Sequence, residues 1–357
     1  MSQPERRAAP VLSVMDMVPV SAGHSRTDAL TDMIALARVA DVAGYEHFWL
    51  AEHHGSTTYL SSATIVLMGQ VLAATERMGV ASGGIMLPNH APLVVAEQIG
   101  TLATLYPGRV ELGLGRAPGT DRLTAAALRR GASDPGRFAE EILEILTYLG
   151  DEPVPERLPG SLLLGASSAP DDAAQMPGPD APRVRAIPGE GTHPTVWVLG
   201  SSVNGARVAG RLGLPFAVAS HFAPVQAEAA IATYRSVLES RAEEAQSAQA
   251  LRPVPRVAAA VNVMVAPSQD EARFLFSTAM AAAARIVGNR PAPLDPPTED
   301  PQAWRAYAPG REAAVETAMS LSFVGTADDV ASRLRELADR WDLDEILVVT
   351  YAHDPAL

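Results

Sequence analysis

The sequence predicts an α/β protein, a (β/α)8 TIM barrel with long proline-rich insertions. Short apolar runs alternate along the chain with segments of helical period, which is typical of a parallel α/β fold. Most runs are nearly continuous in apolar residues, as are strands buried on both faces of a parallel sheet. There are eight runs, the number that closes a barrel, so we favour a barrel over an open doubly wound sheet. In order they are residues 11–18, 46–51, 80–87, 109–115, 195–200, 215–220, 256–265 and 345–351.

The segments between the runs carry helix signals. Within 138–149, apolar residues recur on one helix face. Gly44 and Gly213 each stand between a helical segment and the next strand, where helices commonly end on a glycine. Near the C-terminus, Thr326 and Asp329 have the spacing of a capping box, which predicts that a helix begins there.

Two stretches interrupt the repeat without dividing the chain, so we predict one barrel domain over residues 1–357. Residues 151–194 hold nine prolines, and 288–310 is similarly proline-rich, with Trp304 and Tyr307 inside it. Unstructured loops of that length are uncommon in compact domains and are usually lids or disordered segments. We therefore expect both stretches to be insertion loops of one of these kinds.

The composition disfavours several classes of function. With 28 Lys+Arg against 41 Asp+Glu, the formal net charge is −13, which argues against nucleic acid and anionic membranes as partners. The chain has no cysteine, so disulfides, thiolate metal sites and a cysteine nucleophile are excluded. The sequence shows neither the pattern of a signal peptide nor an uninterrupted apolar stretch of membrane-spanning length. We expect a soluble cytoplasmic protein.

Chemistry-bearing residues gather at the predicted carboxyl ends of the strands, where the active site of a barrel lies. Adjacent residues of an extended chain point to opposite sides, so the neighbouring His53 and His54 should not bind one ion. With no His-x-His pair on a strand and no His-Glu-x-x-His motif, we predict no metal site. A serine hydrolase is disfavoured because no Gly-x-Ser-x-Gly elbow is present. The strand-end residues include Asp16, Glu52, Arg116 and five of the eight histidines: His53, His54, His90, His221 and His353.

One predicted strand end has the features of a phosphate site. The strand at 195–200 ends in Gly200, and Ser201 and Ser202 lead into a helix that begins near Asn204. Backbone N–H groups at a helix start, together with serine hydroxyls, form a cradle for an anion. The alternative is that Ser202 only caps the helix.

Two glycine-rich segments predict close approach of a flat ligand. Gly113 and Gly115 precede Arg116, which would face an anion unless it belongs to a structural ion pair. Gly83 and Gly84 interrupt a strand, where glycine is unfavourable and marks a bulge or a backbone that a ligand approaches. Tight packing against a neighbouring helix would explain the same pair.

These segments resemble the bacterial luciferase-like monooxygenase family of flavin-dependent (β/α)8 barrels. Five stretches match in the family's order and span nearly the whole chain: FWLAEHH at 48–54, SGGIMLP at 82–88, GRVELGLGR at 108–116, LGSS at 199–202 and VGTADD at 324–329. Each stretch alone is modest evidence, and the five in order are specific. In luciferase itself a cysteine precedes the residue equivalent to Arg116, whereas this chain has Gly115, so light emission from an aldehyde is not implied.

The resemblance implies that reduced flavin mononucleotide (FMN) is held at the mouth of the barrel. By it, Gly83 and Gly84 correspond to a non-prolyl cis peptide under the flavin ring, and the turn at 200–202 to the segment that binds the phosphate. Arg116 matches a basic residue on the phosphate side of the cofactor. His53 matches the histidine near the reactive edge of the flavin, where oxygen adds.

The resemblance further implies a monooxygenase that uses reduced FMN and O2, through a C4a-peroxyflavin, to oxygenate a small organic substrate. A separate flavin reductase would supply the reduced FMN, by diffusion or by contact. His53, neutral at an ordinary pKa near 6.5, would hydrogen-bond the peroxide or relay its proton. The expected assembly is a homodimer through helices beside the second to fourth strands. The apolar candidates there, which packing in the core would explain equally well, are Val66, Leu67, Val71, Ile99 and Leu102.

Three alternatives stay open. A relative of the same fold would use the deazaflavin F420 for hydride transfer, although the sequence shows no extra Lys/Arg cluster for the longer anionic tail of F420. The second alternative is a protein that binds flavin and catalyses no reaction. A metallohydrolase is the most distant of the three.

Overall fold

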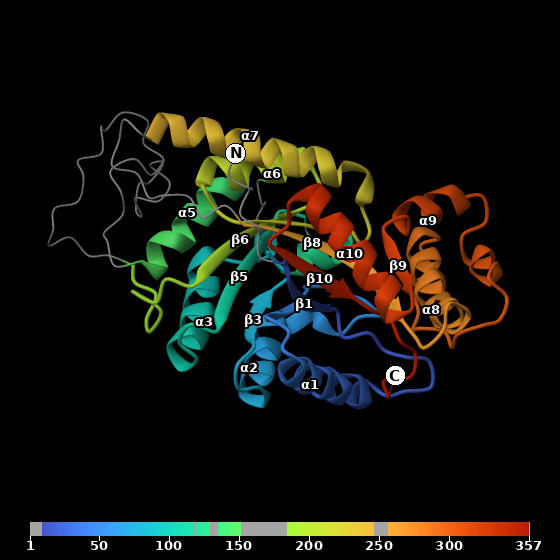
Figure 1. The fold of residues 1–357 in the computed structure, drawn as a ribbon. Coiled ribbons are helices and arrows are strands. Elements are labelled where there is room, and N and C mark those ends of the chain that lie inside the picture. The colour runs from blue at the N-terminus through green and yellow to red at the C-terminus, as the bar shows by residue number, and fades with distance from the viewer. Residues whose placement is uncertain (1–8, 118, 129–134, 151–183, 246–255, 357) are drawn as a thin grey trace, which may run out of the picture.

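Eight parallel strands close into a barrel in the computed structural model, which describes residues 9–117, 119–128, 135–150, 184–245 and 256–356 (Figure 1). They are β1 (Val11–Asp16), β2 (His47–Leu50), β3 (Gly79–Ser82), β5 (Val110–Gly115), β6 (Thr195–Gly200), β7 (Phe216–Val218), β8 (Val257–Val265) and β10 (Glu345–Val349). The hydrogen-bonded order is β10-β1-β2-β3-β5-β6-β7-β8, and parallel pairing of β8 with β10 closes the ring. The predicted fold class is confirmed.

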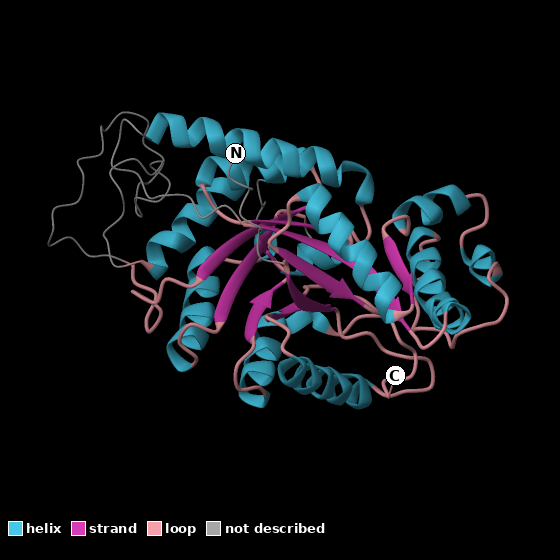
Figure 2. Cartoon of the chain, viewed as in Figure 1, coloured by secondary structure: helices cyan, strands magenta, loops and turns pink. Residues whose placement is uncertain are grey.

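Helices cover the outside of the strands (Figure 2). The longer ones are α1 (Arg26–Ala43), α2 (Thr64–Ala74), α3 (Pro92–Leu105), α5 (Phe138–Leu149), α6 (Val203–Leu212), α7 (Ala227–Ala245), α8 (Gln269–Val287) and α10 (Ala327–Trp341), and α4 (Arg122–Leu128) and α9 (Glu312–Ala318) are short. Across the described residues, no helix combines the length and the apolar character that a bilayer crossing requires.

The helix ends match the sequence predictions in two places and differ in one. Gly44 ends α1 and Gly213 ends α6 with φ of 84° and 71°, a left-handed backbone that glycine adopts without a Cβ penalty. α10 begins where predicted, but the Thr326 side chain makes no capping bond. Asp329 pairs instead with Arg333, at 3.2 Å, one turn further along α10. The predicted capping box is therefore wrong.

Two short strands were not predicted. The run at 80–87 divides into β3 and β4 (Ile85–Met86), and the peptide between Gly83 and Gly84 is cis, as the family resemblance implies. β9 (Ser322–Gly325) pairs in parallel with the carboxyl end of β8. β9 reads SFVG and so lacks the continuous apolar run by which the other strands were recognised.

The insertion at 288–310 is packed and partly helical, so the expectation of a disordered loop is wrong there, and its use as a lid stays a prediction. It contains a 3-10 helix, η5 (Ala303–Tyr307), and Trp304 packs with Ala284 of α8 and Val315 of α9 in a small core of its own. This unit projects from one side of the barrel (Figure 1). Of the other insertion, residues 151–183 lie outside the described part of the chain.

Apolar side chains fill two layers. A larger core lies between the strands and the surrounding helices, and a smaller one fills the interior of the barrel. Trp49 and Trp197 meet edge to face inside the barrel, with 5.3 Å between their ring centroids. The interior is therefore packed, and a ligand can reach only its ends.

The predicted dimer surface is partly wrong. Val71 and Ile99 are both 0 % exposed and belong to the larger core of their own chain, so they offer no surface to a partner. Leu67 and Leu102 are partly buried against the same core. Val66 is 66 % exposed and is still available for such a contact.

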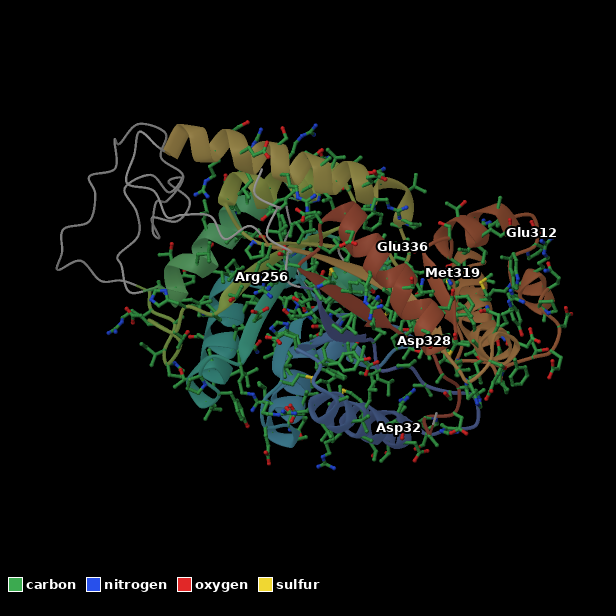
Figure 3. All side chains as sticks on the ribbon, in the orientation of Figure 1. Asp32, Arg256, Glu312, Met319, Asp328 and Glu336 are labelled. Atoms are coloured by element: carbon green, nitrogen blue, oxygen red, sulfur yellow. The ribbon has the colours of Figure 1, made fainter. Side chains whose placement is uncertain are left out.

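A buried charged network closes the amino-terminal end of the barrel. Glu345, fully buried at the start of β10, accepts hydrogen bonds from Ser13 Oγ at 2.6 Å, His47 Nδ1 at 2.9 Å and Trp49 Nε1 at 3.0 Å. Arg256, labelled in Figure 3, donates to the second oxygen of Glu345 at 3.2 Å. Burial alone would raise the pKa of Glu345, but the bonds from His47, Ser13 and Trp49 hold that pKa below its ordinary value.

Replacing Gly113 by alanine should strain the barrel. A Cβ at Gly113 would lie 2.1 Å from the Ser82 backbone oxygen and 2.5 Å from Leu199 Cδ1. Because a backbone oxygen cannot move aside, we expect Gly113→Ala to lower the free energy of unfolding by about 3 kcal/mol. Urea unfolding measures this loss. Gly69→Ala in α2 is the matched control: its Cβ would meet only Leu102 Cδ2, at 3.4 Å, so stability should stay equal or rise by up to about 1 kcal/mol. Equal losses in both variants would contradict the expectation.

Candidate active site

The structure brings every sequence-predicted site residue to the carboxyl end of the barrel. His53 follows β2, Gly83 and Gly84 join β3 to β4, Arg116 follows β5, and residues 200–202 follow β6. Since all these strands are parallel neighbours, their carboxyl ends form one mouth.

The predicted phosphate cradle and Arg116 lie side by side. Gly115 pairs with Leu199 in the β5–β6 register, so Arg116 and Gly200 follow directly on neighbouring positions of two paired strands. Ser202 stands at the start of α6, but its side chain makes no capping bond to that helix. This observation disfavours the reading of Ser202 as only a cap.

Polar groups of this cradle have no protein partner. Neither the Ser201 and Ser202 hydroxyls nor the Arg116 guanidinium forms a side-chain hydrogen bond or ion pair with the described residues. The structural ion pair considered for Arg116 is therefore not found there. The first N–H groups of any helix also lack partners within the helix, and they add positive potential at the same point.

Gly83 and Gly84 are required by the barrel itself. A Cβ at Gly84 would lie 2.6 Å from the Gly113 oxygen on β5, and one at Gly83 would lie 3.0 Å from Met15 and 3.3 Å from Trp49. The alternative, that the two glycines pack against a helix, is therefore wrong. They pack against the neighbouring strand β5 and the barrel interior. The pair also leaves this point of the mouth without side chains.

His53 is a half-buried, neutral imidazole whose Nδ1 is fully buried. Its ring packs against Tyr59, with 5.2 Å between ring centroids, and its Nδ1 is buried without a hydrogen-bond partner. Burial lowers the pKa of His53 to about 4, and the charge of Glu52 opposes this shift only partly. The ordinary pKa expected from the sequence is therefore corrected, and His53 is uncharged at neutral pH.

His221 is a second neutral imidazole, and its pairing with His53 was missed by sequence reasoning. It follows β7, which lies across the ring from β2 in the strand order. Its Nδ1 is also buried and unpartnered, and burial, with the nearby His53, lowers its pKa to about 3. Buried polar atoms are almost always hydrogen-bonded, so these two nitrogens are candidates for contact with a ligand. Ser61 Oγ and Trp341 Nε1 are also buried without a partner among the described residues.

Two tyrosines and an aspartate complete the described part of the mouth. Tyr59 Oη donates to Tyr351 Oη at 3.4 Å. Burial raises the pKa of Asp16 to about 6 and that of Tyr351 well above its ordinary value. Tyr59 lies in a loop, and no sequence motif surrounds it. The signal that could have identified it is its aromatic side chain near the end of a strand.

His54 points away from His53, as predicted. His54 Nε2 lies 2.8 Å from Glu52 Oε1, and His90 Nε2 lies 2.9 Å from the same oxygen. Burial raises the pKa of Glu52, but hydrogen bonds from His90 and His54 outweigh it and hold the pKa below its ordinary value. The remaining strand-end histidine, His353, contacts the Ala22 carbonyl at 3.2 Å.

The low pKa values of His53 and His221 predict acid sensitivity. Below pH 6.5 the unfolded chain protonates these histidines, whereas the folded chain does not until about pH 4 and pH 3. The free energy of unfolding should therefore fall by about 1–2 kcal/mol per histidine between pH 6.5 and about pH 5. Urea unfolding across this pH range measures the fall. In His221→Gln, the part of the fall that comes from His221 should be absent. An unchanged pH dependence in His221→Gln would contradict the burial argument.

Solved structures show the same fold with two different flavin-type cofactors. One is the oxygenating constituent of 3,6-diketocamphane monooxygenase from a Pseudomonas putida plasmid in complex with FMN (19 % identity, TM-score 0.66, 98 % of this chain and 94 % of that one). Another is an F420-dependent secondary alcohol dehydrogenase (15 % identity, TM-score 0.59, 96 % of this chain and 94 % of that one). At these identities the likeness establishes the fold.

The comparisons also identify the family. Residues 12–342 match the family model described as luciferase-like monooxygenase. A protein of Escherichia coli K12 named luciferase-like monooxygenase is 39 % identical over 337 residues, which are 94 % of this chain and 90 % of that protein. The crystal structure of apo-MsnO8 is 30 % identical with a TM-score of 0.76, covering 98 % of this chain and 95 % of that one. The chain belongs to the luciferase-like monooxygenase family.

Proposed function

We propose that this protein is an FMN-dependent monooxygenase that uses O2 to oxygenate a small organic substrate, with reduced FMN supplied by a separate reductase. One observation carries the proposal: the barrel mouth joins an unpaired anion cradle to two neutral imidazoles, each with a buried, unpartnered Nδ1. The cradle consists of Arg116, Ser201 and Ser202 at the start of α6, and the imidazoles are His53 and His221.

The residues present fit FMN. Arg116 and the two serine hydroxyls, with the N–H groups that begin α6, supply the donors that a phosphate monoester requires. Gly83 and Gly84 place no side chain between β3 and β4, so at this point of the mouth a planar ring would meet backbone alone. Family membership and the FMN complex of a protein with the same fold support the same cofactor.

The side chains of the mouth have defined tasks in such a reaction. Bound reduced FMN would supply the electrons with which O2 is activated for transfer of one oxygen atom. His53 is neutral, so one ring nitrogen holds a proton and the other accepts a hydrogen bond. His221 offers the same pair of groups from the opposite side of the mouth. Together they can bind oxygen atoms of the substrate or oxidant and move a proton without adding charge to a buried site.

Hydride transfer with F420 is the second candidate, because an F420-dependent dehydrogenase shares the fold. Among the described strand ends, Arg116 is the cation that lies at the cradle. A single cation suits one phosphate better than the longer anionic tail of F420. Parallel anaerobic titrations with reduced FMN and reduced F420 separate the two cofactors. We expect tighter binding of FMN, followed by O2 uptake that a substrate panel couples to product. Preferential binding of F420 without O2 uptake would overturn the proposal.

Removing the cradle should weaken FMN and leave riboflavin unaffected. Riboflavin lacks the phosphate, so Arg116→Ala and Ser202→Ala should each raise the dissociation constant of FMN by about tenfold or more while that of riboflavin stays constant. Fluorescence titration of both flavins measures this. Ser268→Ala is the control. Ser268 caps α8 through its own side chain, and α8 follows β8 rather than the cradle. Parallel losses for FMN and riboflavin would place the phosphate elsewhere.

A further inference from the structure

Beside the cradle and the two neutral imidazoles lies a separate cluster of metal-ligating side chains that the proposed function does not use. It consists of Glu52, His54 and His90, whose ligand atoms all lie within 4.8 Å of one another. His54 Nε2 lies 2.8 Å from Glu52 Oε1, and His90 Nε2 lies 2.9 Å from Oε1 and 3.0 Å from Oε2. Asn89 Nδ2 also donates to Oε1, at 3.4 Å. The three side chains therefore converge on a single point.

The two His–Glu separations, 2.8 and 2.9 Å, fit neighbouring ligands of one metal ion. Ligands at right angles and about 2.1 Å from a metal lie about 3.0 Å apart, close to both His–Glu separations. Two histidines and one carboxylate on a common face form a set that binds divalent first-row transition metals and leaves further positions to water.

The carboxylate is held in place and the histidines are accessible. The Glu52 side chain is 1 % exposed, and its other oxygen, Oε2, accepts the Met86 N–H at 3.2 Å. The His54 and His90 side chains are 12 % and 28 % exposed, so an ion can reach the cluster from solvent. A fixed, buried carboxylate with two half-open histidines is a preformed site rather than a chance surface group.

The cluster joins two loops that are distant in sequence. Glu52 and His54 follow β2, and His90 follows the 3-10 helix η2 (Leu87–Asn89) beyond β4. We propose that Glu52, His54 and His90 bind one divalent transition-metal ion, which fastens these two loops together beside the Gly83–Gly84 segment. The sequence prediction of no metal rested on local motifs, and no local motif links residues 52–54 to residue 90.

Metal titration of the flavin-free, untagged protein tests this site. With Zn2+ as the probe in calorimetry, we expect one ion per chain with a dissociation constant below about 1 µM, and a higher melting temperature once the ion is bound. Glu52→Gln, His54→Gln and His90→Gln should each weaken binding by more than about a hundredfold. His53→Gln is the matched control, because it changes the adjacent histidine on the opposite side of the chain and should leave Zn2+ affinity unchanged.

The outcomes separate a built site from casual binding. Co2+ in place of Zn2+ should give a visible ligand-field spectrum that disappears in Glu52→Gln, and circular dichroism confirms that each variant is folded. Failure of the wild-type protein to bind Zn2+ below about 100 µM would overturn the site. Equal affinity in the wild type and all three variants would also overturn it, by assigning the ion to adventitious surface binding. Neither result bears on FMN, because no flavin is present.

Discussion

Replacing His53 by alanine is expected to preserve FMN binding and to lower the rate of product formation by about 10²- to 10⁴-fold, the range for loss of a positioned acid–base group. The orphaned Nδ1 of His53 is the basis, because it is the buried polar group beside Tyr59 that a bound reactant would satisfy. Electrons from reduced FMN should then pass to O2 without oxygenating substrate. Product and hydrogen peroxide, measured together per flavin oxidised, give the coupling ratio.

Two further variants make the His53 result specific. His53→Gln keeps an amide that can hydrogen-bond, so it should recover part of the coupling. His24→Ala removes an exposed histidine whose ring meets His353 edge to face, so it should keep the full coupling ratio. Unchanged coupling in His53→Ala would remove His53 from the mechanism, and FMN binding in the same variant shows whether the site is intact.

Replacing Glu345 by alanine is expected to lower the free energy of unfolding by about 3 kcal/mol, the low end for a broken buried pair. The change removes the buried acceptor of several hydrogen bonds, while His47 and Arg256 keep a second carboxylate, Glu111, at 3.6 and 3.4 Å. Glu345 is 0 % exposed and holds Ser13, His47 and Arg256 at the base of the barrel. Urea unfolding measures the loss. Glu316→Ala breaks the exposed pair with Arg305 and should change stability by less than about 1 kcal/mol.

The stability supplied by the Glu345–His47 pair has a defined pH window. Burial lowers the pKa of His47, but the hydrogen bond and charge of Glu345 outweigh burial and raise that pKa above 6.5. The stability that His47 contributes is therefore complete below pH 6.5 and is lost as the pH rises through the pKa of the folded state. The pKa of Glu345 lies below 4.5, so its share is present above 4.5 and lost as pH falls through the folded value. The difference between wild type and Glu345→Ala should therefore be largest between pH 4.5 and pH 6.5. A difference that is flat with pH would contradict the pairing.

Much of the fold could be predicted from the sequence because its signals are local. Continuous apolar runs mark strands buried on both faces, and Gly44 and Gly213 mark helix ends through their own backbone preference. The errors arose where tertiary contacts decide. Trp304 organises the 288–310 insertion around a small core that no periodicity reveals, and Asp329 exchanges a predicted cap for an ion pair with Arg333.

The candidate site was predictable in its parts and not in its pairings. Strand ends alone placed His53, Arg116 and the 200–202 turn at one mouth, since parallel strands share their carboxyl ends. The pKa of His53 could not be predicted, because it depends on burial beneath residues from other loops. The same holds for His221, across the barrel, and for His90, whose partner Glu52 lies 38 positions earlier. Such contacts depend on barrel closure, which the sequence shows only as a count of strands.

A crystal structure of the protein with FMN tests the central claim most directly. We predict phosphate density within hydrogen-bonding reach of Ser201, Ser202 and Arg116, with the ring system over Gly83–Gly84 and its reactive edge toward His53. Phosphate bound at another strand end, or a ring whose reactive edge turns away from both His53 and His221, would contradict the account.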